Sequence, residues 1–184
     1  MFQPIVKYQF VRRYCNPQQG WTVYVDIDPS EEGRTGGERK TAESKERQKK
    51  MLQQAKDAIS KLNGMGVCLG GKRSEWFKRE KLPPIEGDRD IVAFHRKKKI
   101  LLIAEVEGAS SGQPEQKLYK AIGQLVMAAS DKPPRGWKRR LVLVVHGEQI
   151  AEKMKKATAL KKLGIYTCAI GADKKEEWLN EKLL

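Results

Sequence analysis

Two apolar runs separated by five polar residues constrain the fold of this chain more than any other feature of its sequence. The runs cover positions 90–94 (DIVAF) and 100–106 (ILLIAEV), and the segment between them reads HRKKK. A connection this short joins two strands only as an antiparallel hairpin. If Lys97 and Lys98 form a two-residue loop, Asp90 faces Glu105 across the two strands. A three-residue loop would shift the register and separate them.

The same register gathers negative charge at the open end of the hairpin. Side chains alternate along a strand, so Glu107 points to the same side as Asp90 and Glu105, and Val106 points away. Three neighbouring carboxylates repel one another unless they take up a proton or hold a cation. Mg²⁺ prefers such oxygen ligands, so the pattern favours a magnesium site. The alternative interpretation is a solvated acidic strand end.

The second half of the chain alternates strands with helices. A helix begins at Pro114, an apolar strand covers 141–146, a helix covers 150–160, and a strand covers 165–171. Such alternation predicts parallel strands with right-handed crossovers. Together with the antiparallel hairpin, it predicts an α/β fold in which a mixed central sheet is flanked by helices on both faces.

The first half is less regular. Segments 5–14 and 20–27 are rich in Val, Tyr and Phe and predict two strands, whereas 28–50 is charged and almost free of apolar residues. We therefore expect an N-terminal β-hairpin and mobile charged loop over 1–39, and an α/β core over 40–184. In the core, apolar spacing predicts a helix from Met51. Segment 72–87 reads as a loop, and Asp173 as the start of a last helix.

Charge indicates the partner. The formal net charge is +14, which favours a polyanion such as nucleic acid, although a basic protein without such a partner is the alternative. Two basic clusters are candidates to follow a phosphate backbone. They contain Arg96, Lys97, Lys98 and Lys99 in the hairpin turn, and Arg135, Lys138, Arg139 and Arg140 before the strand at 141–146.

Other chemistries lack support in the sequence. The three cysteines are far apart and form no C-x-x-C pair, which argues against a disulfide framework and a zinc site. No apolar run approaches the roughly 20 residues that span a bilayer, and no signal peptide is recognisable. We expect no membrane partner and an intracellular location. In a prokaryote this location is the cytoplasm, and in a eukaryote the nucleus and the organelles are also open as alternatives.

The segments GDRDIVAF, LLIAEVEG and PEQKLYKAIGQL together resemble the PD-(D/E)XK nuclease superfamily, the fold of type II restriction endonucleases. The resemblance covers roughly positions 40–171. It implies a restriction endonuclease-like sheet in which Asp90 and Glu105 bind Mg²⁺, or Mn²⁺ as a substitute, with the Val106 carbonyl as a further ligand. It also implies a Mg²⁺-dependent DNA endonuclease that works as a homodimer or with a partner subunit.

One position departs from the family pattern. Glu107 stands where the family signature has a lysine, and an acidic residue there is known among restriction endonucleases. The resemblance implies that Glu107 acts as a ligand or orients water, and that Lys117 or Lys120 on the following helix takes the place of the lysine. The departure keeps two alternatives open. One is a catalytically inactive nucleic-acid-binding module or subunit with the same fold, and the other is a metal-free structural subunit.

Overall fold

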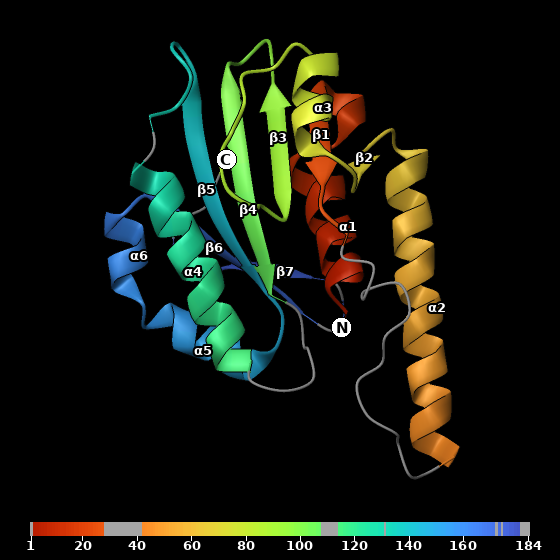
Figure 1. Ribbon diagram of the computed structural model, residues 1–184. Coiled ribbons are helices and arrows are strands. Elements are labelled where there is room, and N and C mark those ends of the chain that lie inside the picture. The colour runs from red at the N-terminus through yellow and green to blue at the C-terminus, as the bar shows by residue number, and fades with distance from the viewer. Residues whose placement is uncertain are drawn as a thin grey trace.

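The protein is described here by a computed structural model that covers residues 2–27, 42–107, 114–130, 132–171, 173 and 175–180 (Figure 1). Its elements, in chain order, are α1 (Gln3–Tyr14), η1 (Pro17–Gln19), β1 (Trp21–Val25), α2 (Ala42–Gly64), β2 (Cys68–Leu69), α3 (Arg73–Arg79), β3 (Ile91–His95), β4 (Ile100–Glu107), α4 (Pro114–Ser130), β5 (Lys138–Val145), α5 (Glu148–Lys155), α6 (Thr158–Lys162), β6 (Ile165–Ile170) and β7 (Glu176–Trp178).

The described strands form one seven-stranded sheet in the order β2-β1-β3-β4-β5-β6-β7. Strands β4, β5 and β6 are parallel, whereas β3 is antiparallel to both of its neighbours, β1 and β4. Helix α4 connects β4 to β5, and α5 and α6 connect β5 to β6, as parallel neighbours require. The predicted α/β class with a mixed sheet is confirmed.

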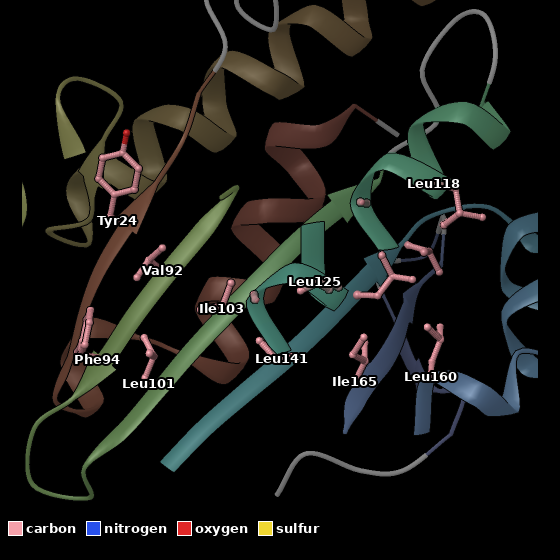
Figure 2. Packing of buried hydrophobic residues seen from close by; sticks show 14 of the residues in the cluster. Tyr24, Val92, Phe94, Leu101, Ile103, Leu118, Leu125, Leu141, Leu160 and Ile165 are labelled. Atoms are coloured by element: carbon pink, nitrogen blue, oxygen red, sulfur yellow. The ribbon is translucent and has the colours of Figure 1, made fainter. Parts of the chain in front are cut away.

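Helices cover both faces of this sheet, as predicted. On one face, side chains of α3, α4, α5 and α6 pack onto the strands, and Figure 2 shows Leu125 of α4 close to Ile103 and Leu141. On the other face, α1 and the end of α2 pack onto the strands. Leu125 is fully buried, and burial of one such side chain stabilises the fold by about 2 kcal/mol.

The β3–β4 hairpin has the predicted register. Phe94 pairs with Leu101 and Ile91 with Ala104, which places Lys97 and Lys98 at the centre of the turn. The Lys99 amide donates a hydrogen bond to the Arg96 carbonyl at 3.3 Å and closes this turn.

The predicted N-terminal β-hairpin is wrong, because residues 3–14 form helix α1. Its β-branched and aromatic residues favour a strand locally, but Val6, Phe10 and Val11 are buried at helical spacing on the sheet. The strand predicted at 20–27 is confirmed as β1, which lies inside the sheet. The N-terminal segment therefore shares the core of the rest of the chain. Of the predicted charged loop, residues 28–41 lie outside the described residues, and 42–50 belong to α2.

Two further predictions need correction. Residues 73–79 form helix α3 rather than loop, although Trp76 and Phe77 are buried on the core as expected. The predicted last helix is wrong, because residues 176–178 form strand β7 on the edge of β6. Trp178 there donates a hydrogen bond from Nε1 to the Tyr14 hydroxyl at 3.0 Å, a contact between the two ends of the chain. None of the helices in the described ranges is both long and apolar enough to cross a membrane.

Candidate functional site

The candidate site lies at the open end of the hairpin, where β3 begins and β4 ends. Asp90 immediately precedes β3, and its atoms are bound from three directions. Its carbonyl accepts a hydrogen bond from the Asp26 amide at 2.8 Å, and its Oδ2 accepts one from the Val106 amide at 2.8 Å. Its Oδ1 is 2.9 Å from the Nζ of Lys7. Asp90 is therefore fixed between β1, β4 and α1.

Glu105 lies beside Asp90 on β4 and is 2% exposed. Burial, together with the charge of Asp90, raises the pKa of Glu105 to about 9, and Arg89 opposes part of this shift. Glu105 therefore carries a proton at neutral pH when no cation is bound. Its Oε1 has no hydrogen-bond partner among the described residues. A buried and unsatisfied carboxyl oxygen is costly, so this atom is the one that would gain most from a cation.

Glu107 is the next residue on the same side of β4 and is also buried. Burial raises its pKa to about 7, with a second contribution from the charge of Asp90. The charges of Lys117 and Lys7 and a hydrogen bond with Gln3 act in the opposite direction. The structure therefore brings Lys117, at the start of α4, near Glu107.

A buried arginine completes the charges of the site. Arg89 is 6% exposed, and its Nη1 is 3.8 Å from the Oε1 of Glu105. The guanidinium folds over Gly87, where a Cβ would lie 3.0–3.1 Å from three of its atoms. Gly87 also has a φ of +72°, so both its backbone conformation and the closeness of Arg89 require a glycine at this position. The space that Gly87 leaves is therefore what allows Arg89 to reach Glu105.

Two site residues on α1 were missed by sequence analysis. Lys7 is 1% exposed, and its Nζ contacts the Asp26 carbonyl at 2.7 Å in addition to Asp90. Gln3 donates a hydrogen bond from Nε2 to the Val106 carbonyl at 2.8 Å. The signal in the sequence was Lys7, a lysine inside the apolar stripe that contains Val6 and Phe10. This stripe can be seen only when residues 3–14 are recognised as a helix.

The expected cluster of three carboxylates around one ion is not present. Within the described ranges, no three His, Cys, Asp or Glu side chains are placed to hold one metal ion. Asp90, Glu105 and the Val106 carbonyl are oxygen donors of the kind that Mg²⁺ uses, since this ion commonly binds one or two carboxylates together with water and phosphate oxygens. Of these donors, the Oε1 of Glu105 is the buried oxygen that lacks a hydrogen-bond partner.

The two basic clusters come together, but not at the carboxylates. Lys138 pairs with Ile100 across the sheet, next to the hairpin turn. Glu105 lies five residues further along β4, or about 17 Å away. The turn residues Arg96, Lys97, Lys98 and Lys99 and the exposed Arg135 lie at this opposite end of the sheet.

Several members of these clusters are engaged within the protein. Arg139 donates to the Ala129 carbonyl at 2.7 Å and also to the Ala128 carbonyl, at the end of α4. Arg140 binds the Tyr166 hydroxyl at 2.9 Å, and Lys99 lies 5.3 Å from the centroid of the Trp137 ring. Arg139 therefore satisfies the last carbonyls of a helix, which is a structural role.

Comparison of the chain with protein-family models, with curated proteins and with solved structures yields no match.

Proposed function

We propose that the protein is a Mg²⁺-dependent phosphodiesterase that cuts DNA. One observation carries the proposal. A half-buried carboxylate, Asp90, and a buried carboxyl group, Glu105, lie together at the open end of the hairpin, with an oxygen on Glu105 that lacks a hydrogen-bond partner and a buried lysine on Asp90. The net charge of +14 supports a polyanionic substrate.

The residues have separate tasks in this proposal. Asp90 and Glu105 would hold Mg²⁺ with the Val106 carbonyl, and the ion would supply Lewis-acid chemistry, in which a phosphate is polarised and the pKa of a water molecule is lowered. Lys7 fixes the Asp90 carboxylate, and Gln3 fixes the Val106 carbonyl. Lys117 is exposed at the start of α4, so it is accessible to a phosphate oxygen.

Glu107 is suited to handle the proton of the attacking water. A general base works best when its pKa is close to the working pH, and the pKa of Glu107 is about 7. Glu105 must lose its own proton before it can bind a cation, because its pKa of about 9 keeps it neutral at pH 7. Metal affinity should therefore rise with pH.

One observation favours a second candidate, a nucleic-acid-binding module without catalysis. The carboxylate and carbonyl that would bind an ion already have protein partners, since Asp90 is paired with Lys7 and the Val106 carbonyl with Gln3. A site of this kind can be maintained by its internal charges alone.

Cleavage of supercoiled plasmid DNA in Mg²⁺ or Mn²⁺ tests the proposal. Asp90→Asn and Glu105→Gln should each lower the rate by more than about 100-fold, because loss of a residue that only supports a metal ligand already costs about 10- to 100-fold. Glu75→Gln removes an exposed carboxylate on α3 and should retain the wild-type rate. Salt-sensitive binding without cleavage by the wild type would favour the binding module. Absence of any binding at low salt would favour the structural subunit.

A further inference from the structure

We propose that helix α2 is the surface that follows the phosphate backbone of duplex DNA next to the candidate site. The segment from Lys45 to Lys56, called the α2 arm below, carries this role. The inference rests on the proposed function, because it takes DNA as the substrate, but it concerns binding and is tested separately from cleavage.

Helix α2 is held at one end only. It has 23 residues, and its buried side chains, Ala55, Ala58 and Leu62, lie in its C-terminal half. Near that end, the Nζ of Lys61 lies 5.8 Å from the centroid of the Tyr8 ring on α1. The α2 arm, in contrast, is exposed or only half-buried before Ala55. A helix needs packing on one face for stability, and the C-terminal half provides it.

The α2 arm extends past the end of the sheet that holds the carboxylates. Helices α1 and α2 run in the same general direction in Figure 1, and Gln3 places the start of α1 at Val106. Lys61 on α2 lies beside Tyr8 on α1, and Gln3 comes five residues before Tyr8, so Lys56 is the residue of α2 that lies about beside Gln3. The part of α2 from Ala42 to Lys56 therefore extends on the order of 20 Å beyond Gln3, at a rise of about 1.5 Å per residue.

The charge of the arm matches a polyanion. From position 45 to 56 it carries one acidic residue, Glu46, and five basic ones, Lys45, Arg47, Lys49, Lys50 and Lys56. Lys45, Lys49 and Lys56 lie four and seven residues apart, so they share one side of the helix. In the part of the chain that the structure describes, no carboxylate forms an ion pair with these three lysines.

These features fit a nucleic-acid backbone better than a protein helix. A coiled-coil partner would require an apolar stripe on the exposed side, whereas that side of the arm is lysine-rich. A straight row of lysines contacts phosphates without reading base edges, which gives affinity rather than sequence specificity. The other basic clusters lie at the far end of the sheet, whereas the α2 arm extends past the end at which β4 carries Glu105.

The test measures binding of a labelled DNA duplex of roughly 20 base pairs by fluorescence anisotropy in EDTA, over a range of salt concentrations. The triple variant Lys45→Gln, Lys49→Gln, Lys56→Gln removes three charges and keeps residues that favour helix. We expect its affinity to fall about tenfold or more at low salt. The slope of log Kd against log salt should fall by about 2 to 3, since each phosphate contact contributes roughly 0.9.

Two further variants carry the same loss of charge. In the matched control, the exposed residues Lys78, Lys161 and Lys162 on α3 and α6 become Gln, and we expect wild-type binding. In the competing variant, Lys97, Lys98 and Lys138 become Gln at the far end of the sheet. Equal loss of affinity in all three variants would overturn the inference, because binding would then follow net charge only. Loss in the competing variant with none in the arm variant would overturn it as well.

The substrate class is tested in the same way. If the arm variant loses affinity for an RNA of equal length but not for duplex DNA, the assignment to DNA is wrong. Cleavage in Mg²⁺ separates this inference from the proposed function. A wild-type protein that binds through the arm but cuts nothing would remove the nuclease proposal alone. A protein that cuts DNA and is unaffected by the arm substitutions would remove this inference alone.

Discussion

Replacement of Glu105 by glutamine should stabilise the protein at neutral and alkaline pH when no divalent cation is present. The free carboxyl group of a glutamate ionises near pH 4.5, whereas burial and Asp90 raise the pKa of Glu105 in the folded protein to about 9. Between these values the unfolded chain is ionised, and folding must take up a proton. Stability that is fully present below pH 4.5 is therefore lost as the pH rises toward 9.

The size of the effect follows from this single proton. One proton taken up on folding changes the free energy of unfolding by about 1.4 kcal/mol per pH unit, or about 3 kcal/mol between pH 6 and pH 8. Glu105 is 2% exposed, so solvent screening does not reduce this figure substantially. Glu107 makes the free energy of unfolding depend on pH in a similar way, but only up to its pKa of about 7. The Glu105→Gln variant should lose the pH dependence that Glu105 causes and keep the pH dependence that Glu107 causes.

The measurement is urea unfolding in EDTA, followed by tryptophan fluorescence at several pH values. The difference in stability between Glu105→Gln and the wild type should widen from pH 6 to pH 8. Glu75→Gln, an exposed carboxylate on α3, provides the control and should follow the wild-type curve. Parallel curves for Glu105→Gln and the wild type over this range would show that Glu105 is ionised in the folded protein, and the account of the site given above would be wrong.

Four other outcomes are expected. Saturating Mg²⁺ should raise the midpoint of thermal unfolding more at pH 8 than at pH 6, since a bound ion replaces the proton of Glu105; an equal rise at both pH values would argue against that ligand. Lys7→Met should lower the free energy of unfolding by about 3–5 kcal/mol in urea titrations, because it leaves Asp90 without its buried partner; a loss below about 1 kcal/mol would contradict this. Gly87→Ala should lower the free energy of unfolding by about 1–3 kcal/mol, because of the positive φ at this position and the contact of the new Cβ with Arg89. A variant as stable as the wild type would show that a glycine is not required there. Arg139→Ala should cost about 1–3 kcal/mol in stability and leave duplex affinity unchanged in anisotropy titrations, whereas the reverse result would make Arg139 a phosphate contact.

The parts of the fold that were predictable depend on short-range features. The four residues between β3 and β4 determined the hairpin and its register, and this register placed Asp90 beside Glu105. The alternation of strands and helices after residue 100 predicted the parallel half of the sheet. In each of these cases neighbouring residues in sequence decide the structure, so local patterns suffice.

The parts that were missed depend on contacts between distant segments. Residues 3–14 have the composition of a strand, and only burial on the sheet selects the helix. Strand β7 depends on the contact of Trp178 with Tyr14, near the opposite end of the chain. Because α1 was missed, Lys7 and Gln3 could not be placed at the site. The position of the basic turn, by contrast, was deducible, since the turn of a hairpin lies at the opposite end from its open strands.

The arrangement of charges indicates where an ion would enter. Each acid has a cation nearby, and the three pairs differ in strength. Lys7 is 2.9 Å from Asp90, and Lys117 is exposed near Glu107, but Arg89 is 3.8 Å from Glu105, beyond a normal hydrogen bond. Both the Nε of Arg89 and the Oε1 of Glu105 lack a hydrogen-bond partner among the described residues. An ion held at Glu105 would displace the weakest of the three contacts and satisfy a buried oxygen. The guanidinium, which also donates a hydrogen bond from Nη1 to the Asp88 carbonyl at 3.0 Å, would then be able to pair with a phosphate, for which its planar fork of donors is suited.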